Sequence, residues 1–193
     1  ASDVYKRQGS LSGTDATYSA FFKRLGICRV ATPSELVELL KFLTVAAVPT
    51  GPKIAGFTCS GGGATMLADS AAPLELDFVQ PSSHTATTLT QLLPHTATVT
   101  NPLDYTTPIW GDYERTLPVF KCLLKDEYDS AVLVQDYPAA GLDRSKPHYR
   151  ADSDSFIKAC RIANIPAAIC STLPENLDAE TRSHVCLLYT SPS

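Results

Sequence analysis

Apolar positions along the chain recur with two different spacings, which divide it into helices and strands. Apolar residues three or four positions apart predict amphipathic helices, and short runs of apolar, often β-branched residues predict strands covered on both faces. The predicted helices cover residues 16–25, 64–71, 87–93, 113–125 and 149–163, another starts at residue 33, and a last one opens within 175–182. The predicted strands cover residues 27–30, 54–58, 74–79, 98–100, 130–135 and 166–170.

Capping residues and a proline-rich loop separate the N-terminal segment from the rest of the chain. Thr14 is placed to cap the first helix, and Gly26 follows that helix where a left-handed residue would end it. Thr32 precedes the second helix, and Glu35 three residues on predicts a capping box. Residues 48–52 carry two prolines and a glycine, so we expect a domain boundary there.

Residues 52–185 alternate five times between strand and helix. This order predicts an α/β domain with a doubly wound parallel sheet, in which the loops after the strands share one edge and bind ligands. Within the helices, Pro118 is expected to cause a kink or an early end. Asp152 and Asp154 are expected to start a helix, where their charge suits the helix dipole.

Composition and charge exclude several classes of protein. The chain has 193 residues, with 16 Lys and Arg against 20 Asp and Glu, and this balance argues against a nucleic-acid partner. No apolar run approaches the length of a membrane span, and no N-terminal block has the basic, apolar, small-residue order of a signal peptide, so we expect no membrane partner and a cytoplasmic location. The six cysteines form no C-x-x-C pair and are expected to be small buried hydrophobes, and the histidines lack metal-ligand spacing.

The glycine-rich turn after the predicted strand 54–58 is the first candidate site. Ser60, Gly61, Gly62 and Gly63 would present backbone N–H groups at the start of a helix, which suits a phosphate group. The turn matches neither a Walker loop nor a dinucleotide fingerprint. The alternative is a tight turn whose glycines serve only to pack the helix against the sheet.

The loop over residues 101–108 is the second candidate, because Asn101 and Asp104 offer an amide and a carboxylate at a strand end. Its alternative is an Asx-turn that satisfies its own backbone. The polar residues in 135–138 and 171–176 also follow strands and are weaker candidates.

The two ends of the chain look unlike the rest. Residues 1–8 read ASDVYKRQ and residues 186–193 read CLLYTSPS, and both resemble translations of sequencing-adapter read-through. We expect both segments to be artefactual tails of a gene truncated on both sides. The alternative is a pair of ordinary disordered termini.

Four segments in order carry a family resemblance: GSLSGTDATYSAFFKRLGICRV, TPSELVELL, GFTCSGGGATMLADSA and NPLDYTTPIWG. Together they resemble the NDP-forming (ADP-forming) acyl-CoA synthetases, relatives of succinyl-CoA synthetase, over about residues 9–180. The resemblance implies that residues 9–50 are the C-terminal remnant of a flavodoxin-like CoA-ligase domain. Residues 52–185 would then be the following flavodoxin-like, succinyl-CoA synthetase-like domain.

The resemblance also implies a reaction and its ligands. The family converts acyl-CoA, ADP and phosphate into acid, CoA and ATP through an acyl phosphate and a phosphohistidine. CoA, ADP or ATP, phosphate and magnesium are implied for the intact enzyme, together with CoA-binding and ATP-grasp domains that this chain lacks. By resemblance, Ser60, Gly61, Gly62 and Gly63 form a phosphate-holding helix N-terminus, and Asn101 and Asp104 match an N-P-x-D motif near the same edge.

The sequence departs from the family at the phosphohistidine loop, which usually reads H-T-G-[SA]-L-x-G. Arg7 and Gln8 stand at the positions of the histidine and the threonine. Because arginine cannot take up and release a phosphoryl group as imidazole does, we expect this fragment alone to be inactive. We expect the natural histidine codon to have been overwritten by the artefactual tail.

Two other functions remain open from the sequence. The first is a non-catalytic acyl-CoA-sensing module of a protein that also carries an acetyltransferase domain. The second is an unrelated flavodoxin-like domain that binds another phosphorylated ligand.

Overall fold

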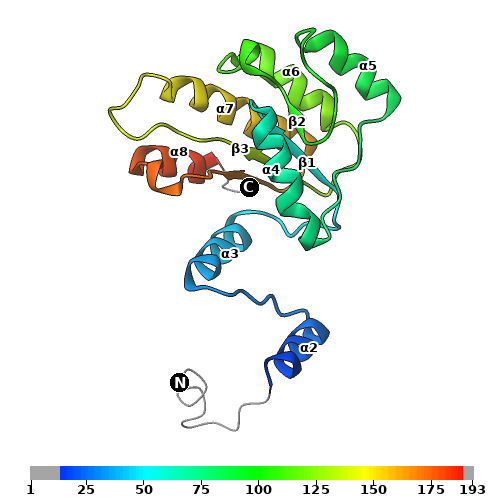
Figure 1. The fold of residues 1–193 in the computed structure, drawn as a ribbon, viewed down its shortest axis with the longest axis vertical. Coiled ribbons are helices and arrows are strands. Elements are labelled where there is room, and N and C mark those ends of the chain that lie inside the picture. The colour runs from blue at the N-terminus through cyan, green and yellow to red at the C-terminus, as the bar shows by residue number, and fades with distance from the viewer. Residues whose placement is uncertain (1–13, 189–193) are drawn as a thin grey trace. The chain divides into compact units, whose positions relative to one another are not determined.

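The computed structural model describes residues 14–188, with side chains described as far as residue 185. The predicted artefactual tail at residues 1–8, with Arg7 and Gln8, lies outside the described residues, as does the end of the tail at 189–193. The chain divides into two compact units, residues 1–41 and 42–193 (Figure 1).

The helices of the N-terminal segment begin and end where their capping residues predict. Helix α2 spans Asp15–Leu25, with the Thr14 side chain accepting a hydrogen bond from the backbone N–H of Thr17. Gly26 ends this helix in the left-handed conformation at φ 66°. Helix α3 spans Pro33–Val45, and the hydroxyl of Thr32 accepts from the N–H of Glu35 at 3.2 Å. The capping residues therefore set these boundaries as expected.

Neither α2 nor α3 buries a side chain in this structure. Their large apolar residues are exposed instead, among them Phe21, Leu25 and Leu40, each more than half accessible. The strand predicted over residues 27–30 is wrong, because these residues form no strand. A strand requires a neighbouring strand for its backbone groups, and none pairs with this segment in the described chain.

The second unit is built on a four-stranded sheet in which every neighbouring pair is parallel. The strands are β1 (Ile54–Thr58), β2 (Leu103–Asp104), β3 (Ser130–Val134) and β4 (Ala167–Cys170), in the order β2-β1-β3-β4. The longer helices are α4 (Gly61–Ala71), α5 (Ser83–Leu92), α6 (Tyr113–Leu123), α7 (Lys146–Ala163) and α8 (Ala179–Leu188). Three short 3-10 helices complete the list: η1 (Ala72–Leu74), η2 (Thr107–Ile109) and η3 (Pro174–Asn176). This arrangement confirms the predicted doubly wound α/β class.

Alternating residues of β1 show how helices cover both faces of the sheet. A side chain at Gly56 would meet Leu67 of α4 at 2.8 Å, so α4 packs closely on that face. The next residue, Phe57, points to the opposite face and stacks edge-on against Phe120 of α6 at 4.9 Å and Phe156 of α7 at 5.7 Å. All three phenylalanines are fully buried, and each such burial stabilises the fold by about 1.5–3 kcal/mol.

Two predicted strands are absent because a side chain takes their place beside β1. Residues 74–79 contribute only one parallel bridge, between Lys53 and Asp77, and the paired segment after them is 103–104 rather than 98–100. Between these two points the carboxamide of Asn101 accepts from the N–H of Gly56 at 2.9 Å and donates to the carbonyl of Ile54 at 2.8 Å. The side chain thus satisfies backbone groups that a strand would have paired.

Two expectations about the helices are also wrong. Helix α6 continues through Pro118 to Leu123, because several of its residues on either side of the proline are buried in the core. Asp152 and Asp154 do not start a helix, since α7 begins at Lys146. Within the described part of the chain, no helix combines the length and apolar character that a membrane crossing requires.

Candidate functional site

The parallel sheet brings the loops that follow its strands to one edge, as the sequence predicts. Two of these loops face each other. One runs from Cys59 into the start of α4, and the other runs from Asp104 to Gly111. The carboxylate Oδ2 of Asp104 lies 3.5 Å from the position that a Cβ on Gly61 would occupy.

The start of α4 has the features of an anion site. Ser60 caps the helix, and its hydroxyl accepts from the N–H of Gly63 at 3.3 Å. The N–H groups of Gly61 and Gly62 lie in the first turn, where a helix supplies no internal acceptor. Both residues are exposed, and the first turn carries no acidic side chain. These N–H groups and the helix dipole together favour a bound anion.

The three glycines of this turn have different physical reasons to be glycine. A Cβ on Gly63 would lie 2.7 Å from the Thr58 hydroxyl, so Gly63 is needed to pack α4 against β1. A Cβ on Gly62 would meet nothing closer than the Ser60 hydroxyl at 3.7 Å. None of the three has a left-handed backbone. Packing therefore explains Gly63, whereas Gly61 and Gly62 leave the backbone open to a ligand.

Asn101 and Asp104 lie in different surroundings. Asn101 is 3% exposed, and its carboxamide donates to the carbonyl of Val79 at 2.9 Å in addition to its two bonds to β1. Asp104 accepts from the N–H of Thr106 at 2.9 Å, which is the Asx-turn that the sequence offered as an alternative. Only Asp104 points its second oxygen toward the start of α4.

The loop after Asp104 is strained at Thr106. Its φ of 69° and ψ of 148° lie close to a region almost restricted to glycine, at a cost of about 1–3 kcal/mol. The Thr106 hydroxyl is buried, and it has no hydrogen-bond partner among the described residues. Such a conformation persists only where surrounding contacts hold it.

A buried carboxylate on α7 accepts hydrogen bonds from both ends of this loop. Asp152 is fully buried and accepts from the Tyr105 hydroxyl at 2.6 Å and from the N–H of Gly111 at 2.9 Å. Burial raises its pKa to about 6, although these two hydrogen bonds oppose the rise. The sequence pattern predicts no role for Asp152 at this site. Its spacing of four from Phe156 puts it on the apolar face of α7, and that signal could have found it.

Cys59 lies at the same edge, and its thiol is a poor nucleophile. Burial raises its pKa to about 11, and the nearby charge of Asp152 adds to the rise. The thiol therefore stays protonated at neutral pH. Of the other cysteines, Cys122 and Cys160 are buried as expected, whereas Cys28 and Cys170 are exposed and contradict that expectation.

The two weaker candidate loops bind each other. The Asp136 carboxylate accepts from the N–H of Thr172 at 2.9 Å and from its hydroxyl at 2.5 Å. Gln135 and Tyr137 are buried in a hydrogen-bonded group with Ser153 of α7. These contacts give both loops a structural role.

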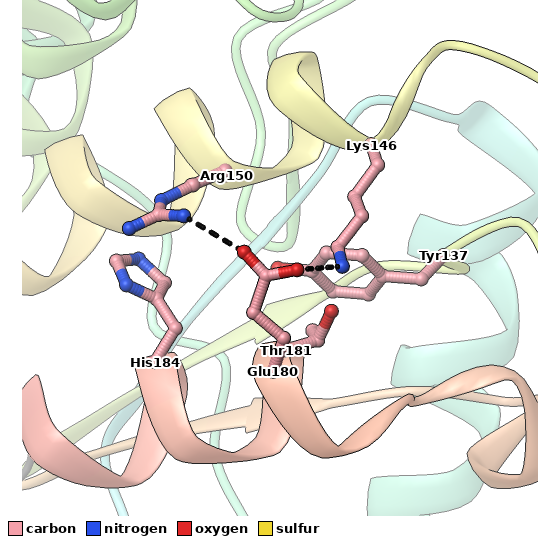
Figure 2. A pocket seen from close by; sticks show the side chains of 6 residues that line it. All are labelled: Tyr137, Lys146, Arg150, Glu180, Thr181 and His184. Atoms are coloured by element: carbon pink, nitrogen blue, oxygen red, sulfur yellow. Dashed lines mark hydrogen bonds and ion pairs between the residues drawn. The ribbon is translucent and has the colours of Figure 1, made fainter. Parts of the chain in front are cut away.

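A small charged pocket lies between α7 and α8, and Figure 2 shows Glu180 of α8 reaching between Lys146 and Arg150 of α7. Its carboxylate pairs with Lys146 at 2.7 Å and Arg150 at 3.4 Å. Lys146 also pairs with Asp178, and this contact lowers the pKa of the Asp178 carboxyl. Because these charged side chains pair with one another, we interpret the pocket as a structural contact between α7 and α8 and not as a ligand site.

Comparison with known proteins finds no matching family model. The chain is 35% identical over 96 residues to the ADP-forming acetate–CoA ligase of Methanocaldococcus jannaschii, a match covering 50% of this chain and 14% of that protein. It is 33% identical over 119 residues to the α subunit of ADP-forming acetate–CoA ligase II of Pyrococcus furiosus, covering 61% of this chain and 25% of that subunit. The chain therefore spans a quarter or less of the length of these curated relatives.

Solved structures share the fold. A dinucleotide-forming acetyl-coenzyme A synthetase of Candidatus Korarchaeum cryptofilum, in complex with phosphate and ADP, superposes with a TM-score of 0.72 at 18% identity. That match covers 96% of this chain and 39% of the synthetase. A protein of Pyrococcus horikoshii superposes with a TM-score of 0.68 at 22% identity, covering 92% of this chain and 44% of its own.

Proposed function

We propose that this chain, a relative of the NDP-forming acyl-CoA synthetases, is a fragment of an enzyme that converts acyl-CoA, ADP and phosphate into acid, CoA and ATP. Its sequence similarity to two ADP-forming acetate–CoA ligases supports the reaction class. Because the chain spans at most a quarter of those relatives, the CoA-binding and ATP-grasp domains would come from the rest of the protein.

The start of α4 is the observation that carries the proposal. In the intact enzyme, the N–H groups of Gly61 and Gly62 would donate hydrogen bonds to phosphate oxygens, and Ser60 would hold the helix end in place. The absence of side chains at these two glycines lets the phosphate approach the backbone closely. An exposed helix dipole contributes only about 0.3–1 kcal/mol, so strong binding would need the missing domains.

Asp104 would serve a different part of the substrate. Its carboxylate faces the start of α4 but repels an ionised phosphate. It would instead accept a hydrogen bond from a donor group of the ligand and so orient that group beside the phosphate. Asn101 would act indirectly, since its carboxamide bonds keep the backbone of β1 in place below the site.

Magnesium would be held elsewhere in the intact enzyme. Over residues 14–185, no group of three or more His, Cys, Asp or Glu side chains could hold a metal ion. We propose that the ion binds with the nucleotide in the ATP-grasp domain of the intact enzyme, held by one or two carboxylates and the phosphate oxygens.

The N-terminal segment would be the remnant of the preceding CoA-ligase domain. Residues 9–50 include α2 and α3, whose apolar side chains are exposed rather than packed. A sheet from the missing part of that domain would cover them in the intact protein.

The test is a titration of this chain with inorganic phosphate, followed by NMR of the backbone amides. We expect the signals of Gly61 and Gly62 to shift in a saturable way, with a weak Kd in the millimolar range, about −4 kcal/mol or weaker. Sodium chloride at matched ionic strength is the control, because screening alone would move charged surface residues everywhere. Shifts that are absent from these two glycines would contradict the phosphate site.

An acyl-CoA-sensing module is the second candidate. It is favoured if the native gene encodes an arginine at the position of Arg7, because arginine cannot carry a phosphoryl group. The two candidates differ in phosphorylation. Incubating the full-length protein from the native gene with γ-labelled ATP should label a histidine in the synthetase. It should label nothing in the sensing module.

A further inference from the structure

One carboxylate contacts both ends of the loop that faces the start of α4. Asp152 accepts from Tyr105, directly after β2, and from Gly111, two residues before α6 begins. Its two oxygens take one bond each, and the side chain is fully buried. No lysine or arginine pairs with it in the described structure.

The same helix contacts the far end of the loop a second time. Gly111 has a φ of 78°, and a Cβ there would lie 2.4 Å from the ring of His148 on α7. The neighbouring Trp110 stacks on that ring, with the ring centres 5.1 Å apart. The loop therefore rests on α7, and Asp152 joins it there by hydrogen bonds.

The near end of the loop is fixed to the sheet as well. The N–H of Tyr105 donates to the carbonyl of Thr58 at 2.9 Å, and the Tyr105 ring packs edge-on against Phe120 at 5.0 Å. Asp104 and the strained Thr106 flank this anchored tyrosine. Any shift of Tyr105 would therefore move the Asp104 carboxylate relative to Gly61.

A buried carboxylate with no lysine or arginine paired to it is costly, and a chain that only needed packing would favour an apolar residue at this position. Two hydrogen bonds aimed at the two ends of one strained loop account for its presence. This loop also places the Asp104 carboxylate next to the glycine-rich turn at Ser60–Gly63.

We propose that Asp152 is a positioning residue for the anion site: it holds the loop from Tyr105 to Gly111 so that the Asp104 carboxylate stands opposite the start of α4. This inference rests on the proposed function for its purpose, but the positioning itself is a separate claim about the loop. Asp152 touches no ligand and acts through Tyr105 and Gly111.

Three substitutions in this chain test the claim by NMR. D152A removes both acceptors. D152N keeps the shape, because its amide oxygen still accepts from Gly111 and its NH₂ group can donate to the Tyr105 hydroxyl. D154A is the matched control, since Asp154 lies on the same helix but pairs with His184 of α8.

We expect D152A to keep the amide signals of β1 and β3 but to shift those of Thr106 and Gly111. Hydrogen exchange at the Gly111 N–H should accelerate about tenfold or more, as expected for loss of a bond to a charged acceptor. In D152A the Kd for inorganic phosphate, read at Gly61 and Gly62, should rise at least about threefold. The separate variants D152N and D154A should each keep the wild-type Kd.

Unchanged loop signals and an unchanged Kd in a folded D152A chain would overturn the inference. If D152A does not fold, Y105F decides, because it breaks one of the two bonds: Thr106 should shift and Gly111 should stay protected, and wild-type signals at Thr106 would contradict the claim. A wild-type chain that gives no phosphate-dependent shift would contradict the proposed function instead. The loop signals would still decide the role of Asp152.

Discussion

Polar side chains near the carboxyl edge of the sheet differ sharply in burial, in hydrogen-bond partners and in pKa. Asn101 and Asp104 stand three positions apart in one motif, yet one is buried against the backbone of β1 and the other faces the site. Asp152 is an acid inside the core, with a pKa raised to about 6. These differences separate residues that maintain the fold from residues that are free to meet a ligand.

The pH dependence of stability should carry the signature of Asp152. A raised pKa means that the native state binds the proton more tightly than the unfolded state. For this group stability is therefore highest below the ordinary pKa of 3.8 and falls as the pH rises from there through about 6. The change is on the order of 3 kcal/mol between pH 4 and 7, from roughly two pKa units.

Urea unfolding of the wild type and D152N at pH 4.5 and pH 7 measures this change. Half-buried carboxylates such as Asp178, whose pKa is lowered, give the opposite trend at lower pH, so the difference between the two proteins is the relevant quantity. We expect D152N to gain stability over the wild type as the pH rises. A difference independent of pH would contradict the raised pKa.

Substitutions at Asn101 and Asp104 should change the free energy of unfolding by very different amounts. N101A leaves the N–H of Gly56 and the carbonyls of Ile54 and Val79 without their side-chain partner, at a cost of about 3 kcal/mol or more in the free energy of unfolding. D104N keeps an acceptor for Thr106 and should change stability by less than about 0.5 kcal/mol. Chemical denaturation checks both, and equal losses would contradict the division of roles.

Thiol reactivity should follow exposure and pKa. Cys28 is exposed, whereas Cys59 is partly buried with a pKa of about 11. We expect a disulfide reagent at pH 8 to modify Cys28 rapidly and Cys59 only on unfolding, as mass spectrometry of digested protein would show. Rapid modification of Cys59 in the native chain would indicate an accessible thiolate.

At the scale of the element, the first turn of α4 contains one glycine that close packing requires, Gly63, and two that have room for a side-chain carbon, Gly61 and Gly62. G63A places a Cβ 2.7 Å from the Thr58 hydroxyl and should destabilise the fold. G62A adds a Cβ that meets only the Ser60 hydroxyl, at an ordinary contact distance of 3.7 Å, and should leave stability unchanged or raise it slightly, because alanine favours a helix over glycine. Thermal unfolding of the two variants checks this contrast, and destabilisation by both would mean that packing explains the whole turn.

The elements also show how far sequence reasoning reaches. Caps such as Thr14 and Thr32 and the apolar runs of β1 and β3 act locally, so their helices and strands could be predicted. The segment at 74–79 could not, because its strand-like pattern is overruled by Asn101, more than twenty positions away in the chain. The anion turn was visible as a run of glycines, whereas the role of Asp152 depends on contacts between three distant segments.

At the scale of the whole molecule, the two units should differ in their contribution to stability. The second unit contains the sheet and the buried core, whereas α2 and α3 bury no side chain. A chain truncated to residues 46–193 should therefore unfold cooperatively, with a free energy of unfolding within about 1 kcal/mol of the full chain. Loss of the cooperative transition would show that the N-terminal segment is needed for the fold.

The same contrast bears on the intact protein. Exposed residues such as Phe21 and Leu40 form apolar faces that a larger protein would cover. The partial coverage of every relative described above supports the proposal that this chain is one part of a longer protein.

The most direct measurement is the rate of ATP formation from acetyl-CoA, ADP and phosphate by the full-length protein from the native gene. G62L should abolish this rate while the protein remains folded, because a side chain there blocks the phosphate from the N–H groups of α4. M66L, an exposed position on the same helix, should leave the rate unchanged. An active G62L enzyme, or a native protein that forms no ATP from any acyl-CoA, would contradict the account.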